Sequence, residues 1–122
     1  MKNISKKKKI ICFDIDNVIC KTNLLNQYNK STPIKKNINL INQIYEKGFE
    51  VVLYTARFMG RCSGNLTEVK KNNQLTIRQL KKWKVNYHKI YFGKPSFDLF
   101  IDDKSLFFKK NWARSLKKKL RI

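Results

Sequence analysis

The chain has 122 residues, 42% of them hydrophobic, and its 28 lysines and arginines outnumber its 8 aspartates and glutamates. This length provides one hydrophobic core, so we expect no second domain. The formal net charge is +20, but lysines occur in every region, which indicates a solvated surface more than a dedicated nucleic-acid surface. Nucleic acid is therefore a partner that the charge allows without favouring it.

The cysteines and the basic residues at the N-terminus bear on the cellular compartment of the protein. Cys12, Cys20 and Cys62 include no CxxC pair and leave one cysteine over in any disulfide scheme, as in a reduced interior. No apolar stretch approaches the roughly 18 residues of a membrane span, and the run after the basic start is too short for a signal peptide. We expect a cytoplasmic protein without a membrane partner, with a flexible basic leader over residues 1–9 and a single domain over residues 10–122.

The first half of the domain alternates strand, helix and strand. Ile10–Phe13 is a short apolar run of the kind found in buried parallel strands. Pro33 opens a segment whose isoleucines recur on one helical face, and Gly48 follows as a stop signal. Phe49–Tyr54 is the second predicted strand.

The second half continues the alternation. A helix is predicted over Thr67–Lys84, a third strand over Tyr87–Phe92, a fourth over Asp98–Ile101, and a basic terminal helix over Leu106–Leu120. Strands that alternate with helices predict an α/β fold with right-handed crossovers and a central parallel sheet covered on both faces.

Polar side chains follow every predicted strand at its carboxyl end, which is where ligands bind in such sheets. They are Asp14 and Asp16, then Thr55 and Arg57, then Lys94, and finally Asp102 and Asp103. Each uncompensated pair of carboxylates about 4 Å apart repels by roughly 4 kcal/mol at an effective dielectric near 20. A hard divalent cation removes that penalty, and Mg²⁺ is the usual choice where phosphate also binds.

These residues resemble, in order and spacing, the four motifs of the haloacid dehalogenase superfamily of phosphohydrolases: DIDNV from Asp14, Thr55 after a strand, Lys94 in FGKP, and IDD before Lys104. The phrases YTAR, QLKKWKVNYHKIYFGKP and FIDDK are more closely similar to small capless phosphatases found beside bacterial capsule and surface-sugar genes. The resemblance implies a three-layer Rossmann-like domain without a cap domain. The sequence departs from the family pattern at Asn17, where glycine is usual because it relieves φ strain.

The resemblance also implies roles for the acids. Asp14 would be the nucleophile that forms an aspartyl-phosphate, and Asp16 would protonate the leaving group and later take a proton from water. Mg²⁺ would be held by the Asp14 side chain, the Asp16 backbone carbonyl and Asp102. Asp103 would support the lysine or the metal shell.

The remaining candidates are cationic or polar. Thr55 would hydrogen-bond a phosphoryl oxygen, and Lys94 would offset the charge on the transferring group. Arg57 and Arg61 either touch substrate or are exposed. His88 is expected to pack or hydrogen-bond near a strand edge and not to catalyse.

The implied activity is Mg²⁺-dependent phosphomonoester hydrolysis, with a sugar phosphate as the expected substrate. Two alternatives stay open: a phosphatase acting on polynucleotide ends, which the charge and an open cleft suit, and a non-catalytic basic nucleic-acid-binding module. The presence of Asp14, Asp16, Lys94 and Asp102 together argues against loss of activity. Because a capless cleft has no lid of its own to exclude water, either a neighbouring subunit or a large substrate must cover it, and of these we favour a homo-oligomer.

Overall fold

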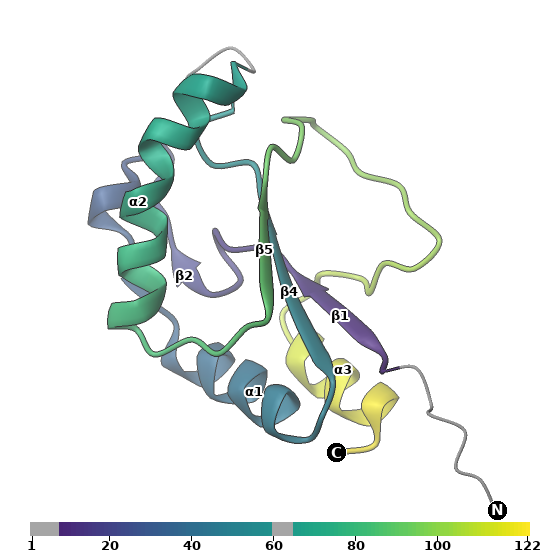
Figure 1. Cartoon of the computed structure of the whole chain (residues 1–122). Helices are drawn as coiled ribbons and strands as arrows, with labels where there is room; N and C mark the ends of the chain where they lie inside the picture. The colour runs from purple at the N-terminus through teal and green to yellow at the C-terminus, as the bar shows by residue number, and fades with distance from the viewer. Residues whose placement is uncertain (1–7, 60–64) are drawn as a thin grey trace, which may run out of the picture.

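The computed structural model describes residues 8–59 and 65–122, and these are arranged around a parallel sheet (Figure 1). The sheet contains β1 (Ile10–Phe13), β4 (Glu50–Thr55) and β5 (Lys89–Phe92) in the order β1-β4-β5. A separate antiparallel pair joins β2 (Cys20–Lys21) to β3 (Thr32–Pro33). The predicted α/β class with a central parallel sheet is confirmed.

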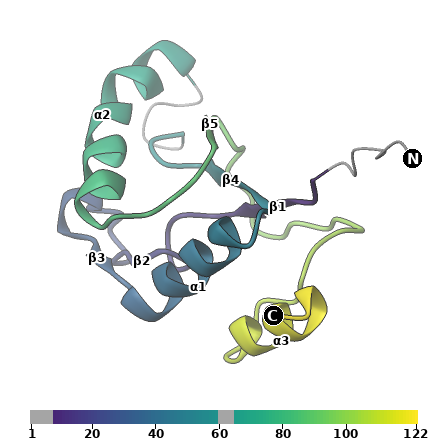
Figure 2. The same ribbon diagram turned by 60° about the horizontal axis from the view of Figure 1, so that its bottom comes forward.

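Helices connect the parallel strands. α1 (Lys35–Glu46) runs between β1 and β4, and α2 (Leu66–Lys82) runs between β4 and β5. Both crossovers move across the sheet in one direction, so right-handed connections place both helices on the same face, as Figure 1 shows. The terminal helix α3 (Trp112–Leu120) lies on the far side of α1 from α2 in both views (Figures 1 and 2). The short 3-10 helix η1 (Tyr28–Lys30) precedes β3.

The core lies between the sheet and α1. Ile38, Ile41 and Ile44 of α1 are buried in one cluster with Val51 and Leu53 of β4. Burial of each such side chain contributes about 1.5–3 kcal/mol. The spacing of these isoleucines is the helical periodicity read from the sequence, and the contact holds β4 in the centre of the sheet.

The second face of the sheet is covered less completely. Cys12 of β1 and Lys89 and Tyr91 of β5 are exposed there, whereas Val52 of the central strand is buried. The edge strands therefore present one open face, and β1 has a partner only on its β4 side among the described residues.

The prediction of a fourth strand at Asp98–Ile101 is wrong. Residues 93–111 contain no helix or strand. Phe97 and Phe100 pack against each other at 5.0 Å between ring centroids. Both rings also lie close to Lys94 Nζ, at 5.4 and 5.6 Å. Residues three apart lie on opposite faces of a strand. The contact between the rings of Phe97 and Phe100 is therefore incompatible with an extended strand at this place.

The other predicted boundaries agree with the observed ones to within two residues, except that the terminal helix begins at Trp112 and not at Leu106. Residues 1–7 of the expected leader lie outside the described residues. Within the described part of the chain, no helix is both long and apolar enough to cross a membrane.

Candidate active site

β1 ends in a tight turn that presents two aspartates. Asp14 Oδ1 accepts a hydrogen bond from the Ile15 N–H at 2.8 Å, and the Asn17 N–H donates to the Cys20 carbonyl at 2.6 Å. Asn17 has a φ of 66°, in the left-handed region. Asparagine tolerates this conformation better than most residues do, so the turn forms despite the absence of the usual glycine.

The carboxyl ends of the three parallel strands bring Asp14, Thr55 and Lys94 together. Lys94 Nζ lies 3.9 Å from Asp14 Oδ2, and the Lys94 N–H donates to the Thr55 carbonyl at 3.1 Å. Thr55 is fully buried, and its hydroxyl accepts the Arg57 N–H at 3.1 Å. The arrangement expected from the strand ends is thus present for these three residues.

Aromatic rings surround the Lys94 ammonium. Its Nζ lies 5.7 Å from the ring centroid of Tyr54, in addition to its contacts with Phe97 and Phe100. The Lys94 side chain is 16% exposed, and that of Asp14 is 39% exposed. Cation–π contacts of this kind hold an ammonium without neutralising it, so the Lys94 charge remains directed at Asp14.

Asp16 is held by a buried arginine. Arg57 Nη2 lies 3.0 Å from Asp16 Oδ1, and Arg57 Nε donates to Asp16 Oδ1 and Oδ2 at 3.1 and 3.2 Å. The Thr22 hydroxyl donates to Asp16 Oδ1 at 2.5 Å and bonds the Ser31 hydroxyl at 2.8 Å. The two carboxylates of the turn thus differ: Asp14 is accessible and Asp16 is fixed.

The remaining donors of Arg57 are used inside the protein. Nη1 donates to Thr76 Oγ1 at 3.1 Å and Gln79 Oε1 at 2.5 Å, and Nη2 donates to Cys20 Sγ at 3.4 Å and Ser31 Oγ at 3.5 Å. Arg57 is only 1% exposed. The expectation that this arginine reaches substrate or lies at the surface is therefore replaced by a buried role as the partner of Asp16.

The sequence did not single out four members of this network: Thr22, Ser31, Thr76 and Gln79. Thr76 and Gln79 follow Arg57 by 19 and 22 residues and belong to α2. No local motif connects them to Arg57, and the only usable signal is that both are polar residues on the buried face of a helix.

Burial shifts the pKa of two groups in the turn. It raises the pKa of Asp14, while Lys94 and the Ile15 N–H oppose the increase by favouring the carboxylate. Burial also raises the pKa of the Cys20 thiol. A raised pKa disfavours the reactive thiolate, so Cys20 is not a candidate nucleophile.

The oxygen donors expected for Mg²⁺ are only partly assembled. The Asp14 carboxylate and the backbone of Asp16 share one turn, but Asp102 and Asp103 are exposed, and Asp102 Oδ1 accepts the Lys104 N–H at 3.3 Å. Among the described residues, no three His, Cys, Asp or Glu side chains are grouped as a metal site. Asp102 follows the segment that does not join the sheet, so the residues as placed do not form the expected three-donor site.

The two remaining candidates are His88 and Arg61. His88 Nδ1 accepts the Val51 N–H at 3.0 Å, and its ring stacks on Tyr45 at 4.4 Å between centroids. This confirms that His88 packs and hydrogen-bonds at a strand. Arg61 lies outside the described residues.

Comparison with known proteins identifies the fold. No protein-family model and no curated protein sequence matches the chain. A structural-genomics target from Vibrio cholerae superposes with a TM-score of 0.75 at 24% identity, over 92% of this chain and 98% of that chain. A chain of the Pnkp1/Rnl/Hen1 RNA repair complex superposes with a TM-score of 0.52 at 15% identity, over 92% of this chain and 31% of that chain.

A third similar structure is the D,D-heptose 1,7-bisphosphate phosphatase from B. bronchiseptica, solved with magnesium and phosphate. It gives a TM-score of 0.50 at 16% identity, over 93% of this chain and 64% of that chain. These likenesses support the fold and not a substrate. The chain has a haloacid dehalogenase-like α/β fold.

Removing Arg57 should destabilise the protein strongly. Arg57→Met leaves Asp16 and Gln79 without their cation, and breaking a buried pair in this way costs about 3–5 kcal/mol. Urea unfolding measures the change, with Lys104→Met as a matched exposed control. The double variant Arg57→Met/Asp16→Asn should recover part of the loss. Strictly additive single effects would show that the two side chains are not coupled.

Proposed function

We propose that this protein is a phosphomonoester hydrolase that transfers a phosphoryl group to Asp14. The observation that carries the proposal is the accessible Asp14 carboxylate with the Lys94 ammonium 3.9 Å away, at the carboxyl end of a parallel sheet. The carboxylate can reach a phosphorus atom, while the ammonium offsets the charge of the phosphoryl oxygens. The fully buried Thr55 is a neighbouring hydroxyl that we assign to a phosphoryl oxygen.

The reaction has two half-reactions. A carboxylate oxygen of Asp14 bonds to phosphorus as the bond from phosphorus to the leaving oxygen breaks, and the leaving oxygen takes a proton from Asp16. Water then attacks the phosphorus of the aspartyl-phosphate, Asp16 accepts a proton from that water, and the Asp14 carboxylate is released with phosphate. Each half-reaction avoids a harder direct displacement.

Arg57 is assigned a positioning role in this scheme. Its guanidinium contacts both oxygens of Asp16, and its other end is anchored on Thr76 and Gln79 of α2. Gln79 in turn donates to the Tyr28 carbonyl at 2.7 Å. The orientation of the acid/base group therefore depends on how α2 packs against the sheet.

Mg²⁺ is the proposed cofactor. The Asp14 carboxylate and the Asp16 carbonyl are hard oxygen donors of the type that Mg²⁺ prefers, and the similar heptose bisphosphate phosphatase was solved with magnesium and phosphate. When bound, the ion would neutralise charge on the phosphoryl oxygens. The third expected donor, Asp102, lies apart from this pair, so the roles above belong to the side chains alone.

The function is tested by hydrolysis of an aryl phosphate. Activity is expected with Mg²⁺ and should stop on chelation, and Asp14→Asn should lose essentially all turnover while staying folded. Asp16→Asn should accumulate a hydroxylamine-labile phosphoenzyme, since an aryl leaving group needs little protonation but the attacking water still needs a base. Intact-mass spectrometry detects the adduct, and Asp98→Asn is the exposed control. Turnover by folded Asp14→Asn would remove Asp14 from the role.

The pH profile follows from the environment of Asp14. The nucleophile must be ionised, and burial raises its pKa, so kcat/KM should fall on acidification at a higher pH than an ordinary aspartate gives. Because Lys94 lowers that pKa, Lys94→Ala should move the acid limb to still higher pH and also reduce kcat.

Lys94→Arg should restore the position of the acid limb, since it returns a cation to the same place. Lys104→Ala is the matched control, because it removes an exposed lysine outside the site. All pH profiles are measured with the same aryl phosphate, so that ionisation of the substrate affects every variant equally. An acid limb that stays in place or moves to lower pH in Lys94→Ala would contradict the electrostatic assignment.

The substrate is proposed to be a sugar phosphate, with a polynucleotide end as the second candidate. The second candidate is supported by the net charge of +20 and by the similarity to a chain of an RNA repair complex. A screen should show a higher kcat/KM for sugar phosphates than for 3′-phosphorylated oligonucleotides at the same ionic strength. The reverse order would favour the polynucleotide reading, and oligonucleotide binding without any turnover would favour the binding module.

A further inference from the structure

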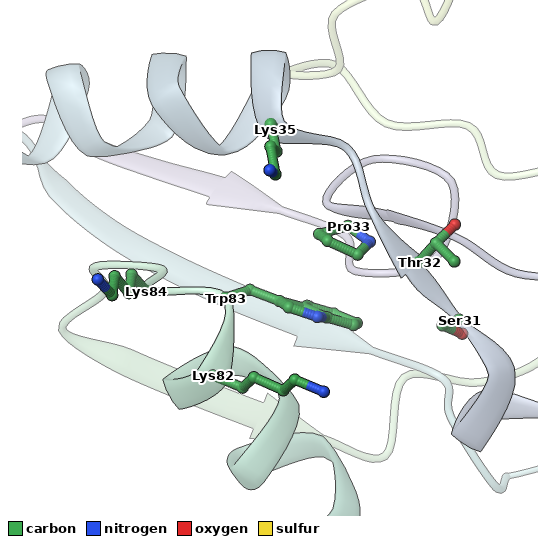
Figure 3. A pocket seen from close by; sticks show the side chains of 7 residues that line it. All are labelled: Ser31, Thr32, Pro33, Lys35, Lys82, Trp83 and Lys84. Atoms are coloured by element: carbon green, nitrogen blue, oxygen red, sulfur yellow. The ribbon is translucent and has the colours of Figure 1, made fainter.

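A concave site lies between β3, the start of α1 and the end of α2 (Figure 3). Its volume is about 520 Å³, within the range of small-molecule sites. The lining residues are Ser31, Thr32, Pro33, Lys35, Lys82, Trp83 and Lys84. Neither Asp14 nor Lys94 is among them, but Ser31 also accepts a hydrogen bond from Arg57 Nη2 at 3.5 Å. We name this site the α1–α2 pocket; it adjoins the network around Asp16 without containing the candidate nucleophile.

The α1–α2 pocket offers cations and hydrogen-bond donors and no carboxylate. Among the described residues, no carboxylate forms an ion pair with Lys35, Lys82 or Lys84. Lys35 is the first residue of α1, whose first turn contains no acidic residue and whose N-cap makes no side-chain hydrogen bond. The positive end of this helix therefore adds to the ammonium groups of Lys35 and Lys82, and an anion with several acceptor oxygens is the matching ligand.

Trp83 gives the pocket an aromatic wall. The side chain is half-buried and packs against the main core, and Figure 3 shows the indole extending between the side chains of Lys35 and Lys82. The backbone that carries it is fixed, because the Trp83 N–H donates to the Gln79 carbonyl at 2.8 Å and Asn42 Nδ2 donates to the Lys84 carbonyl at 2.9 Å. The pocket thus combines a fixed planar apolar surface with cations.

We propose that the α1–α2 pocket binds a nucleotide, with its phosphate oxygens at Lys35 and Lys82 and its base against Trp83. An inorganic anion would leave the indole surface unused, and an uncharged aromatic ligand would leave the ammonium groups of Lys35 and Lys82 unpaired. A nucleotide supplies both parts, and aromatic side chains stack with every base. A free nucleotide and one residue of a single strand present the same chemistry, so the experiment separates these sources.

Binding is measured in the full chain with Lys94→Ala and Trp112→Phe as background substitutions. The first removes the phosphate-binding cation of the active site, and the second leaves Trp83 as the remaining one of 2 tryptophans. ADP without Mg²⁺ should quench Trp83 fluorescence saturably. Lys35→Gln/Lys82→Gln should weaken binding about tenfold or more, because hydrogen bonds between charged groups contribute on that scale.

The matched control is Lys117→Gln/Lys118→Gln, which removes the same charge from two exposed lysines of α3. This control should change the affinity for ADP by less than about twofold, since salt screens the interaction between the ligand and a distant surface charge. Equal weakening by the control and the pocket variant would overturn the proposal, because binding would then follow net charge. Thermal unfolding of each variant confirms that the exposed substitutions leave the fold intact.

The role of the base is tested with pyrophosphate, which lacks one. ADP should bind more tightly than pyrophosphate to the parent protein. Trp83→Leu should remove this difference in affinity, and Trp83→Phe should keep most of it. Calorimetry measures these affinities, because both variants lack the fluorescent indole. Equal affinity for ADP and pyrophosphate in the parent protein would overturn the assignment. A short single-stranded oligonucleotide that binds more tightly than ADP identifies a strand as the source of the nucleotide, and weaker or equal binding identifies the free nucleotide.

Discussion

The buried guanidinium of Arg57 is the constraint on which the rest of the site depends. A buried cation without partners costs several kcal/mol, so acceptors from separate parts of the chain must converge on it. Asp16 comes from the turn after β1, Ser31 from the segment before β3, and Gln79 from α2. The same contacts that satisfy this charge fix the direction of Asp16 and the position of α2 against the sheet.

Two neighbouring carboxylates therefore have different environments. Asp16 receives hydrogen bonds from a guanidinium and a hydroxyl and is 21% exposed, whereas Asp14 has one ammonium at 3.9 Å and is 39% exposed. A group that moves protons benefits from a fixed orientation, and a nucleophile needs an open path to phosphorus. The proposed division of labour between the two aspartates thus agrees with the partners that the fold supplies.

The parts of this structure that could be predicted are those with a local periodicity. The isoleucines of α1 and the apolar runs of β1 and β4 repeat at helix and strand spacing, and the grouping of Asp14 with Lys94 follows from parallel topology. The α2 partners of Arg57 could not be predicted, since Thr76 and Gln79 belong to no motif and do not follow a strand end. The segment Asp98–Ile101 has a strand-like composition, but the contacts of Phe97 and Phe100 with Lys94 depend on the tertiary structure.

The excess of positive charge can explain why phosphates are attracted to the protein, but not why one phosphate would be bound in preference to another. With 28 lysines and arginines against 8 acids, most cations have no carboxylate partner, and the resulting field raises the encounter rate with any phosphate at low ionic strength. Discrimination among phosphates must come from contacts that charge does not supply. At the proposed active site the aromatic rings around Lys94 could supply such contacts, and in the proposed nucleotide pocket the indole of Trp83 could. Aromatic surface beside a lysine is therefore a feature that the two proposed sites share.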